Sequence, residues 1–209
     1  MILKNFVVFE GLDGTGTTSQ LNLLQEAFAA RGMQDCVYFT CEPTAGSIGH
    51  LIRKALSGVA GFDAKTIAYL FGADRCEHIY GKGGILEQQR ARKAVFSDRY
   101  LFSSLAYQGL VAGRELTRNI NAPFPLPEYL FFFDLPAKTA MERIKKRNIP
   151  QEIYEKEAFQ QKVAGEYHAL LQYYAETAPD MRIIRIDASE SIIKIHENIW
   201  NIVCNLPIS

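Results

Sequence analysis

The sequence predicts an α/β protein with a doubly wound, five-stranded parallel sheet and helices on both of its faces. Short apolar runs alternate with longer segments in which apolar residues recur at helical spacing, the order expected of strands joined by crossover helices. The first and fourth runs, at 6–9 and 129–134, are apolar throughout until Asp134, as in strands buried on both faces. No repeat, low-complexity segment or linker divides the 209 residues, so we expect one domain over 1–209.

The apolar runs place the strands. The first run, from Phe6 to Phe9, is β-branched and aromatic, and it enters a loop spaced by glycines. The fourth run is apolar from Tyr129 until it reaches Asp134. We expect the five strands at residues 6–9, 37–40, 94–97, 129–134 and 183–187.

The segments between these runs predict helices. In the first, Leu21, Leu24 and Phe28 share one face, and Gly32 is a C-terminal stop. We expect helices at residues 19–31 (beginning near Thr17), 48–56, 64–80, 84–93, 101–112, 137–147, 152–177 and 192–204. The segment 113–127 carries three prolines near its end and is predicted to be an irregular connection.

Composition excludes several classes of function. The 23 basic and 23 acidic side chains cancel, so no overall field favours nucleic acid or an anionic membrane. No apolar run approaches the ~20 residues of a membrane-spanning helix. The cysteines lack CxxC spacing and paired histidines, so zinc is not expected, and reduced thiols fit a cytoplasmic protein.

The loop after the first strand is almost a phosphate-binding P-loop. The pattern Gly-x4-Gly-Lys-Ser/Thr is met at Gly11, Gly16 and Thr18, but Thr17 stands where the lysine is expected. A strand, a glycine loop and a helix N-terminus in this order turn backbone N–H groups towards an anion. A tight turn before an ordinary helix is the alternative, and the loss of the lysine strengthens it.

An Asp-Arg pair follows the third strand, where open α/β sheets bind ligands. Asp98 is placed to hold Mg²⁺ through water near the P-loop, together with the Thr18 hydroxyl, and Arg99 to clamp two phosphates in a planar fork. A salt bridge between the two residues is the alternative.

At this point the chain resembles the thymidylate (dTMP) kinase family over nearly its full length. The resemblance rests on six blocks in the family's order: FEGLDGTGTTSQ (9–20), EPTAGSIGHLIRKAL (42–56), LFGADRCEH (70–78), SDRYLFSSLAYQG (97–109), DLPAKTAMERIKKR (134–147) and IDASESIIKIHENI (186–199). It implies a P-loop nucleotide kinase that transfers the γ-phosphoryl group of ATP to dTMP, giving dTDP and ADP, with Mg²⁺.

The resemblance also implies the binding residues. For ATP they are Gly11, Leu12, Asp13, Gly14, Thr15, Gly16, Thr17 and Thr18. For dTMP they are Asp13, Glu42, Pro43, Arg53, Phe71, Arg75, Arg99, Tyr107 and Gln108. The bond between Glu42 and Pro43 would be cis, at the start of the monophosphate pocket.

Each dTMP contact has an expected role. Asp13 would contact the sugar 3′-OH near the reacting phosphates, Arg53 would bind the acceptor phosphate, and Arg99 would bridge donor and acceptor. Phe71 would stack on thymine, and Arg75 would hydrogen-bond the base. Solvated helix faces are the alternative for Arg53 and Arg75.

Two further residues complete the nucleoside pocket that the resemblance implies. Tyr107 would lie under the deoxyribose, and Gln108 would line the base pocket. Ordinary helix packing is the alternative for Tyr107 and for Phe71.

The lid, about residues 143–155, departs from the family pattern. Family members carry an arginine at the position of Gly14 or in the lid near Ile153, and this chain has neither. Arg143 and Arg147 would supply the missing charge and act as catalytic residues beside Asp13 and Arg99. Favourable charges at a helix C-terminus are the alternative.

The resemblance implies a homodimer that binds small nucleotides. Two other functions stay open: a kinase of this fold for another nucleotide or nucleoside, and a catalytically silent nucleotide-binding protein. Thr17 motivates the second of these.

Overall fold

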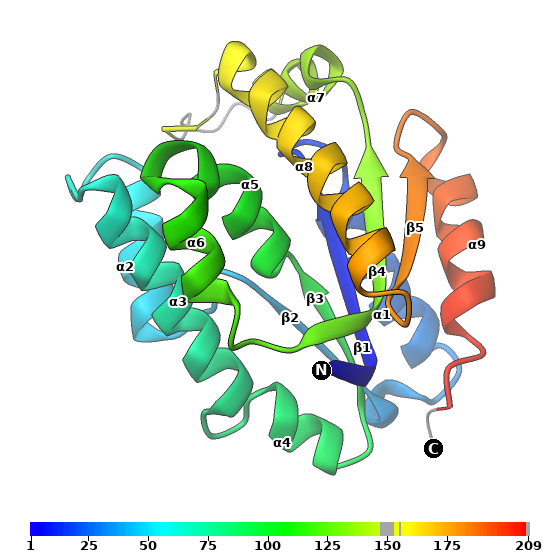
Figure 1. The fold of residues 1–209 in the computed structure, drawn as a ribbon. Helices are drawn as coiled ribbons and strands as arrows, with labels where there is room; N and C mark the ends of the chain where they lie inside the picture. Colours follow the sequence, from blue (N-terminus) through cyan, green and yellow to red (C-terminus); the bar gives the residue numbers. More distant parts are fainter. Residues whose placement is uncertain (147–152, 155, 208–209) are drawn as a thin grey trace.

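The computed structural model describes residues 1–146, 153–154 and 156–207 (Figure 1). Its parallel sheet has the strand order β2-β3-β1-β4-β5 and confirms the predicted fold class. The strands are β1 (Ile2–Gly11), β2 (Val37–Cys41), β3 (Ala94–Asp98), β4 (Leu126–Asp134) and β5 (Arg182–Asp187).

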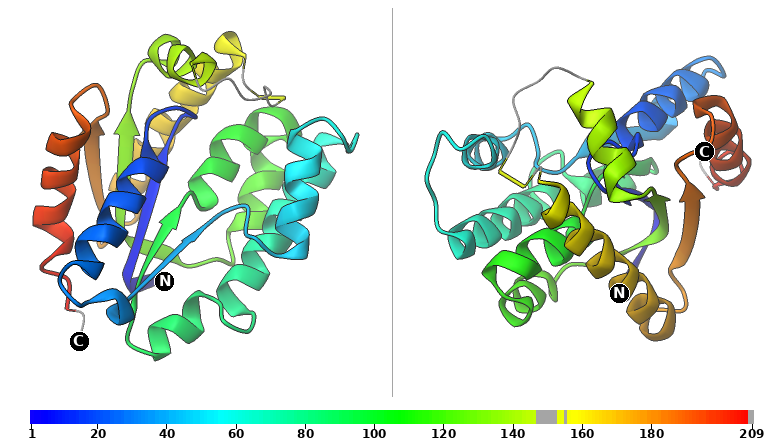
Figure 2. Two further views of the ribbon diagram at one scale, coloured as in Figure 1. Left: turned by 180° about the vertical axis from the view of Figure 1, so that it is seen from behind. Right: turned by 90° about the horizontal axis from the view of Figure 1, so that it is seen from above.

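Helices cover both faces of this sheet. Those described are α1 (Thr17–Ala29), α2 (Ser47–Leu56), α3 (Ala64–Tyr80), α4 (Ile85–Arg90), α5 (Leu101–Ala112), α6 (Arg114–Asn121), α7 (Ala137–Lys145), α8 (Glu157–Thr177) and α9 (Ile192–Val203). A short 3₁₀ helix, η1 (Gln34–Cys36), precedes β2. Helices α1 and α9 lie together on one face, and α5 and α8 lie on the other beside α3 (Figures 1 and 2).

The register of the central strands positions the site. β1 lies between β3 and β4, with Phe9 opposite Asp98 on one side and Phe131 on the other. Because parallel strands end at the same edge of the sheet, the loops that follow β1 and β3 emerge next to each other. The glycine loop and the Asp-Arg pair are therefore neighbours.

Aromatic side chains fill the core around β1. Phe9 stacks on Phe131 with ring centroids 5.2 Å apart, and Phe39 stacks on Phe96 at 5.0 Å. Phe9, Phe96 and Phe131 have no exposed surface. Burial of a side chain of this size contributes about 1.5–3 kcal/mol, so this core holds the strands that carry the site.

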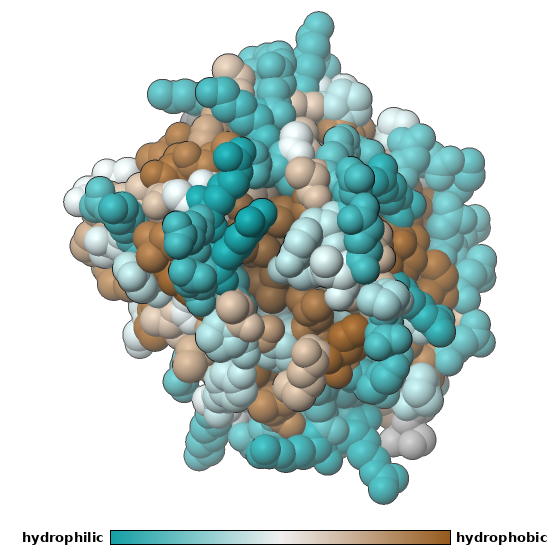
Figure 3. All heavy atoms as spheres, viewed as in Figure 1, coloured by the Kyte–Doolittle hydropathy of each residue, from teal (hydrophilic) through white to brown (hydrophobic). Residues whose placement is uncertain are grey.

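The surface is mixed. Hydrophilic side chains surround smaller hydrophobic patches on the face shown in Figure 3. In the part of the chain that the structure describes, no helix is both long and apolar enough to cross a membrane.

The prediction of an irregular connection over 113–127 is wrong. It contains helix α6 and the first residues of β4. α6 buries only Thr117 and Asn121, so it has no apolar stripe to reveal it. Pro127 lies within β4, opposite Leu3 and next to a register shift, which is one of the few positions that a strand proline tolerates.

Some predicted helix bounds also differ. The helix expected at 152–177 begins at Glu157, after a turn at Ile153 and Tyr154. The helix expected at 84–93 spans only Ile85–Arg90. Those expected at 64–80 and 101–112 have the predicted bounds.

Candidate active site

The P-loop wraps the start of α1 in a conformation that requires its glycines. Gly14 and Gly16 have φ angles of 86° and 98°, which side chains with a Cβ rarely adopt. A Cβ on Gly14 would also lie 2.6 Å from the carbonyl oxygen of Ala140 on α7. Gly16 is the N-cap of α1 and offers no side chain to the first N–H groups of the helix. These N–H groups suit a bound phosphate.

Thr18 and Asp98 meet beside this helix end. The Thr18 hydroxyl donates to Asp98 Oδ2 over 2.5 Å. Asp98 Oδ1 is buried and has no hydrogen-bond partner among the described residues. An unpaired carboxylate oxygen fits a magnesium ion or one of its waters.

The described residues hold no group of three or more His, Cys, Asp or Glu side chains able to bind a metal. Mg²⁺ in nucleotide sites is held by one or two carboxylates with water and phosphate oxygens. The pair of Thr18 and Asp98 therefore fits Mg²⁺ that arrives with a nucleotide.

Arg99 is fixed at the junction of β3 and the P-loop. Its φ angle is 68°, and its N–H donates to the carbonyl oxygen of Phe9 over 2.9 Å. Nη2 contacts Asp13 Oδ1 at 2.5 Å, and Nη1 donates to the carbonyl of Gly11 over 3.1 Å. Burial lowers the pKa of Arg99, but Asp13 together with Tyr107, Tyr167 and Glu10 outweighs it, and the pKa lies well above its usual value. Arg99 is therefore cationic.

One cavity, of about 230 Å³, lies next to Arg99. Its lining includes every residue of the dTMP-binding set predicted from the sequence: Asp13, Glu42, Pro43, Arg53, Phe71, Arg75, Arg99, Tyr107 and Gln108. Leu56, Tyr100, Ser103 and Tyr154 complete it. The structure thus brings the predicted residues together, and their individual roles stay predictions.

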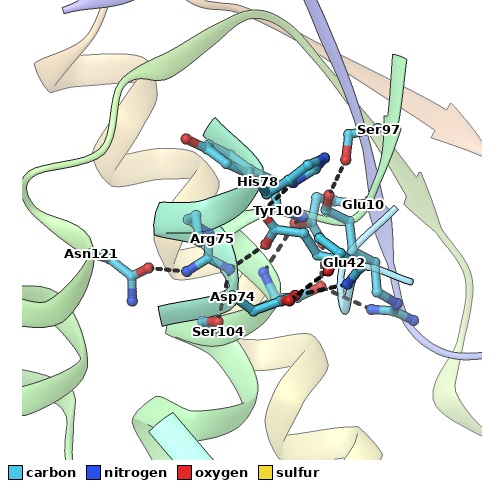
Figure 4. Close-up of polar contacts among 12 residues, drawn as sticks. Glu10, Glu42, Asp74, Arg75, His78, Ser97, Tyr100, Ser104 and Asn121 are labelled. Carbon is cyan, nitrogen blue, oxygen red and sulfur yellow. Dashed lines mark hydrogen bonds and ion pairs between the residues drawn. The ribbon is translucent and has the colours of Figure 1, made fainter. Parts of the chain in front are cut away.

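Arg75 enters this cavity from α3 with its charge fully buried (Figure 4). Nη2 contacts Glu42 Oε2 at 2.6 Å and Ser104 Oγ at 3.1 Å, and Nη1 donates to Asn121. This excludes the solvated helix face considered for Arg75. Its Nε is buried without a hydrogen-bond partner in the described part of the chain.

Glu42 is the counterion of Arg75 and also contacts His78 Nδ1 at 2.9 Å. Burial raises the pKa of Glu42, but Arg75 and the hydrogen bond from His78 outweigh it, so the pKa is lowered. The Glu42-Pro43 bond is cis, as expected.

Arg53, on α2, also lines the cavity. Its guanidinium donates to the carbonyl oxygens of Pro43 and Thr44, the latter at 2.5 Å. Asp74 accepts hydrogen bonds from the N–H and the hydroxyl of Thr44 at 2.7 and 2.6 Å. The loop after β2 is thus tied to α2 and α3.

The Tyr107 hydroxyl contacts the side chains of Asp13 and Gln160. It is 3.3 Å from Asp13 Oδ2 and 3.2 Å from Gln160 Oε1. Burial and the Asp13 carboxylate raise the pKa of Tyr107, so the hydroxyl stays protonated as a donor. Phe71 is half-buried and lines the cavity.

Tyr154 is a cavity residue that was not predicted. It stacks on Phe159 at 5.2 Å, and the side chain of Gln108 hydrogen-bonds it. The N–H of Ile153 donates to the carbonyl of Leu56 over 3.0 Å, which joins this turn to the end of α2.

Of the two arginines predicted to act from the lid, the structure describes only Arg143. Arg143 Nη2 donates to the carbonyl oxygen of Ala188 over 3.0 Å, beyond the end of β5. Arg147 lies outside the described residues. The role of both as suppliers of charge stays a prediction.

A P-loop after β1, an Asp-Arg pair after β3 and a cavity between them define a P-loop nucleotide kinase. A family model described as thymidylate kinase matches residues 9–199. This chain belongs to the thymidylate kinase family, as its sequence blocks predicted. Members of this family are nucleoside monophosphate kinases that use ATP and dTMP as substrates.

Relatives match along most or all of their length. A protein of Treponema pallidum named as a thymidylate kinase is 46% identical over 198 residues, which cover 95% of this chain and 94% of that protein. Proteins of the same name from Pyrococcus horikoshii and Methanocaldococcus jannaschii are 39% and 34% identical, covering 95% and 99% of this chain and 95% and 100% of their own lengths. These matches do not favour a catalytically silent protein.

Proposed function

We propose that this protein transfers the γ-phosphoryl group of ATP to dTMP, giving dTDP and ADP, and so serves dTTP synthesis. The observation that carries the proposal is the cavity beside the P-loop, because every residue of the predicted dTMP-binding set lines it. Family membership supports the same reaction.

The base end of the cavity recognises thymine. Phe71 stacks on the ring, and Arg75 and Gln108 hydrogen-bond its polar edge. Arg75 suits this role because Glu42 and Asn121 already hold its guanidinium in place. A donor fixed before the ligand arrives loses little conformational freedom on binding.

The sugar and the acceptor phosphate lie towards the P-loop. Tyr107 packs under the deoxyribose, Asp13 contacts the 3′-OH, and Arg53 binds the 5′-phosphate. A ligand phosphate also offers Arg53 a charged partner that the carbonyls of Pro43 and Thr44 do not.

The reaction needs positioning and charge rather than a covalent intermediate. An oxygen of the dTMP 5′-phosphate attacks the γ-phosphorus, and the bond to the β–γ bridging oxygen breaks, so ADP leaves. The N–H groups of the P-loop hold the donor phosphates, and Arg99 bridges donor and acceptor. Asp98 and Thr18 would hold Mg²⁺, which neutralises phosphate charge when bound.

The charge that a P-loop lysine normally supplies is missing at Thr17. A threonine hydroxyl offers a neutral hydrogen bond, roughly half as strong as a charge-assisted one. Arg143 lies in the last turn of α7, and Arg147 is four residues further along the chain. We assign them the role of bringing a full positive charge to the γ-phosphoryl group.

We also propose that the enzyme acts in the cytoplasm as a two-fold homodimer, formed through helices on one side of the sheet. Tyr69 and Tyr80 on α3 are 58% and 52% exposed, and Val59 in the preceding loop is 79% exposed. Two-fold pairing is the commonest oligomer symmetry.

The proposed substrate is tested by steady-state ADP formation from Mg-ATP with dTMP, dUMP and dCMP side by side. We expect dTMP to give the highest kcat/KM. Higher kcat/KM with dCMP would contradict the assignment of Arg75 and Gln108 and favour a kinase of the same fold for another nucleotide.

A further inference from the structure

Glu10, near the end of β1, is fully buried and has no part in the reaction described above (Figure 4). Oε1 accepts hydrogen bonds from the backbone N–H groups of Tyr100 at 2.8 Å and Ser103 at 3.1 Å. Oε2 accepts from the hydroxyls of Ser103 at 2.6 Å and Tyr167 at 2.8 Å. Burial raises the pKa of Glu10, and Arg99 and these hydrogen bonds act against it. Four donors and no acceptor face the side chain in these contacts, which is the arrangement that a carboxylate satisfies.

The two backbone donors, the N–H groups of Tyr100 and Ser103, lie at the start of α5. Tyr100 is the N-cap residue of this helix, but its side chain makes no capping hydrogen bond. The carboxylate of Glu10 accepts from the free N–H groups instead and lies at the positive end of the helix dipole. Arg99 immediately precedes Tyr100 and has a φ of 68°, a conformation disfavoured for a long side chain. Glu10 therefore anchors the backbone turn from which Arg99 projects.

Ser103 links Glu10 to the guanidinium of Arg99 by two hydrogen bonds. Its hydroxyl donates to Glu10 Oε2, and its oxygen accepts from Arg99 Nη1 at 2.9 Å and lies 2.9 Å from the Tyr167 hydroxyl. A serine hydroxyl has only one proton to donate. Arg99 can only donate. By accepting the one Ser103 hydroxyl proton, Glu10 keeps the Ser103 oxygen available to Arg99 as an acceptor.

We propose that Glu10 and Ser103 are positioning residues for phosphoryl transfer, which hold the Arg99 guanidinium where it bridges the two phosphates. Neither is assigned a contact with substrate; both act through Arg99. The inference rests on the role of Arg99 in the proposed function. A helix cap alone would not require the second contact, from Ser103 Oγ to the guanidinium.

The test compares variants by kcat and by KM for dTMP and ATP. Ser103→Ala breaks the link and keeps the backbone N–H, and Glu10→Gln keeps the shape but places an amide N–H₂ against donors. Because a preorganised charge acts most in the transition state, we expect kcat to fall about 10-fold for Ser103→Ala and about 10²-fold for Glu10→Gln. KM should change by less than about threefold, and Ser103→Thr should recover most of the loss by restoring the hydroxyl.

Tyr167→Phe is the matched control. It removes a donor to Glu10 and a 2.9 Å contact to Ser103 Oγ, but keeps the hydrogen bonds from Arg99 to Ser103 and from Ser103 to Glu10. We therefore expect kcat to stay within about threefold. Thermal unfolding of every variant separates a loss of kcat from a loss of fold. If Glu10→Gln does not fold, Ser103→Ala and Ser103→Thr still test whether Ser103 positions Arg99.

A double-mutant cycle shows whether the effect passes through Arg99. In an Arg99→Ala background, Ser103→Ala should lower kcat no further. Unchanged kcat in folded Ser103→Ala, or losses that add fully with Arg99→Ala, would overturn the proposal. A small effect of Arg99→Ala alone would instead overturn the role of Arg99, and no turnover of dTMP by the unchanged protein would overturn the proposed function.

Discussion

The Thr18 hydroxyl donates to Asp98 Oδ2 over 2.5 Å and so joins the start of α1 to the end of β3. The remaining Asp98 oxygen, Oδ1, is buried without a partner in the described part of the chain. In the proposed function this is the oxygen that faces Mg²⁺ or its water. In that function, the donor nucleotide and its metal would bind next to this contact.

Asp98→Asn should weaken the use of Mg²⁺. An amide keeps the shape of the side chain but removes the negative charge that favours the cation, and loss of a residue that holds a metal or its water typically costs about 10–100-fold. We expect the Mg²⁺ concentration for half-maximal ADP formation to rise and chelation by EDTA to abolish turnover of the unchanged protein. Asp35→Asn, at an exposed position, is the control. An unchanged Mg²⁺ dependence in Asp98→Asn would remove this residue from the metal site.

Thr17→Lys tests the compensation assigned to the lid. Arg143→Ala and Arg147→Ala should each lower kcat more than about tenfold, because a full positive charge is lost from the transferred group. Adding Thr17→Lys should restore part of that loss by returning the cation to the P-loop. Normal turnover of both arginine variants would leave Mg²⁺ and Arg99 as sufficient, and the enzyme as a slow kinase without a lysine.

Stability should depend on pH through Glu42. Its pKa in the folded protein is below the ordinary value of 4.5 because Arg75 and His78 favour the carboxylate against the effect of burial. The stability gained is present above pH 4.5 and is lost as the pH falls through the lower, folded-state pKa.

Glu42→Gln isolates this contribution. It leaves Arg75 as a buried cation without its counterion, which costs about 3–5 kcal/mol at neutral pH. The difference in unfolding free energy from the unchanged protein should shrink as the pH falls to about 3. Urea unfolding measures it, with Glu26→Gln on the exposed face of α1 as control. A difference that stays constant with pH would contradict the assignment.

A homodimer predicts twice the mass of the 23.6 kDa chain by light scattering at micromolar concentration. Tyr69→Glu should shift this mass towards that of the monomer, because a charge would enter the proposed apolar contact. Tyr173→Glu, at a similarly exposed tyrosine on α8, should not. A monomeric mass of the unchanged protein would contradict the proposed dimer.

The sequence predicts best what local chemistry specifies. The P-loop conformation follows from glycines at positions that need positive φ, such as Gly14 and Gly16. The central strands β1 and β4 follow from continuous apolar runs, because both faces of the sheet are covered there. Resemblance to the family then identified the residues that line the cavity.

The sequence does not reveal partners that long-range packing selects. Helix α6 has no apolar stripe, so Asn121, which holds Arg75, fell in a segment predicted to be irregular. Glu10 lies inside an apolar strand, and its donors come from positions 90 to 157 residues away. Such a carboxylate is explained only when the fold has brought its donors together.

Arg99 gives the most direct test of the central claim, that this chain phosphorylates dTMP despite Thr17. The measurement is steady-state ADP formation with saturating Mg-ATP and dTMP, in the unchanged protein and in Arg99→Ala. Arg118→Ala, an exposed arginine on α6, is the control. We predict dTMP-dependent turnover that falls about 10²–10³-fold in Arg99→Ala and changes little in Arg118→Ala. No dTMP-dependent ADP above background in folded, unchanged protein would contradict the claim, and turnover of Arg99→Ala within a few-fold would contradict the role given to Arg99.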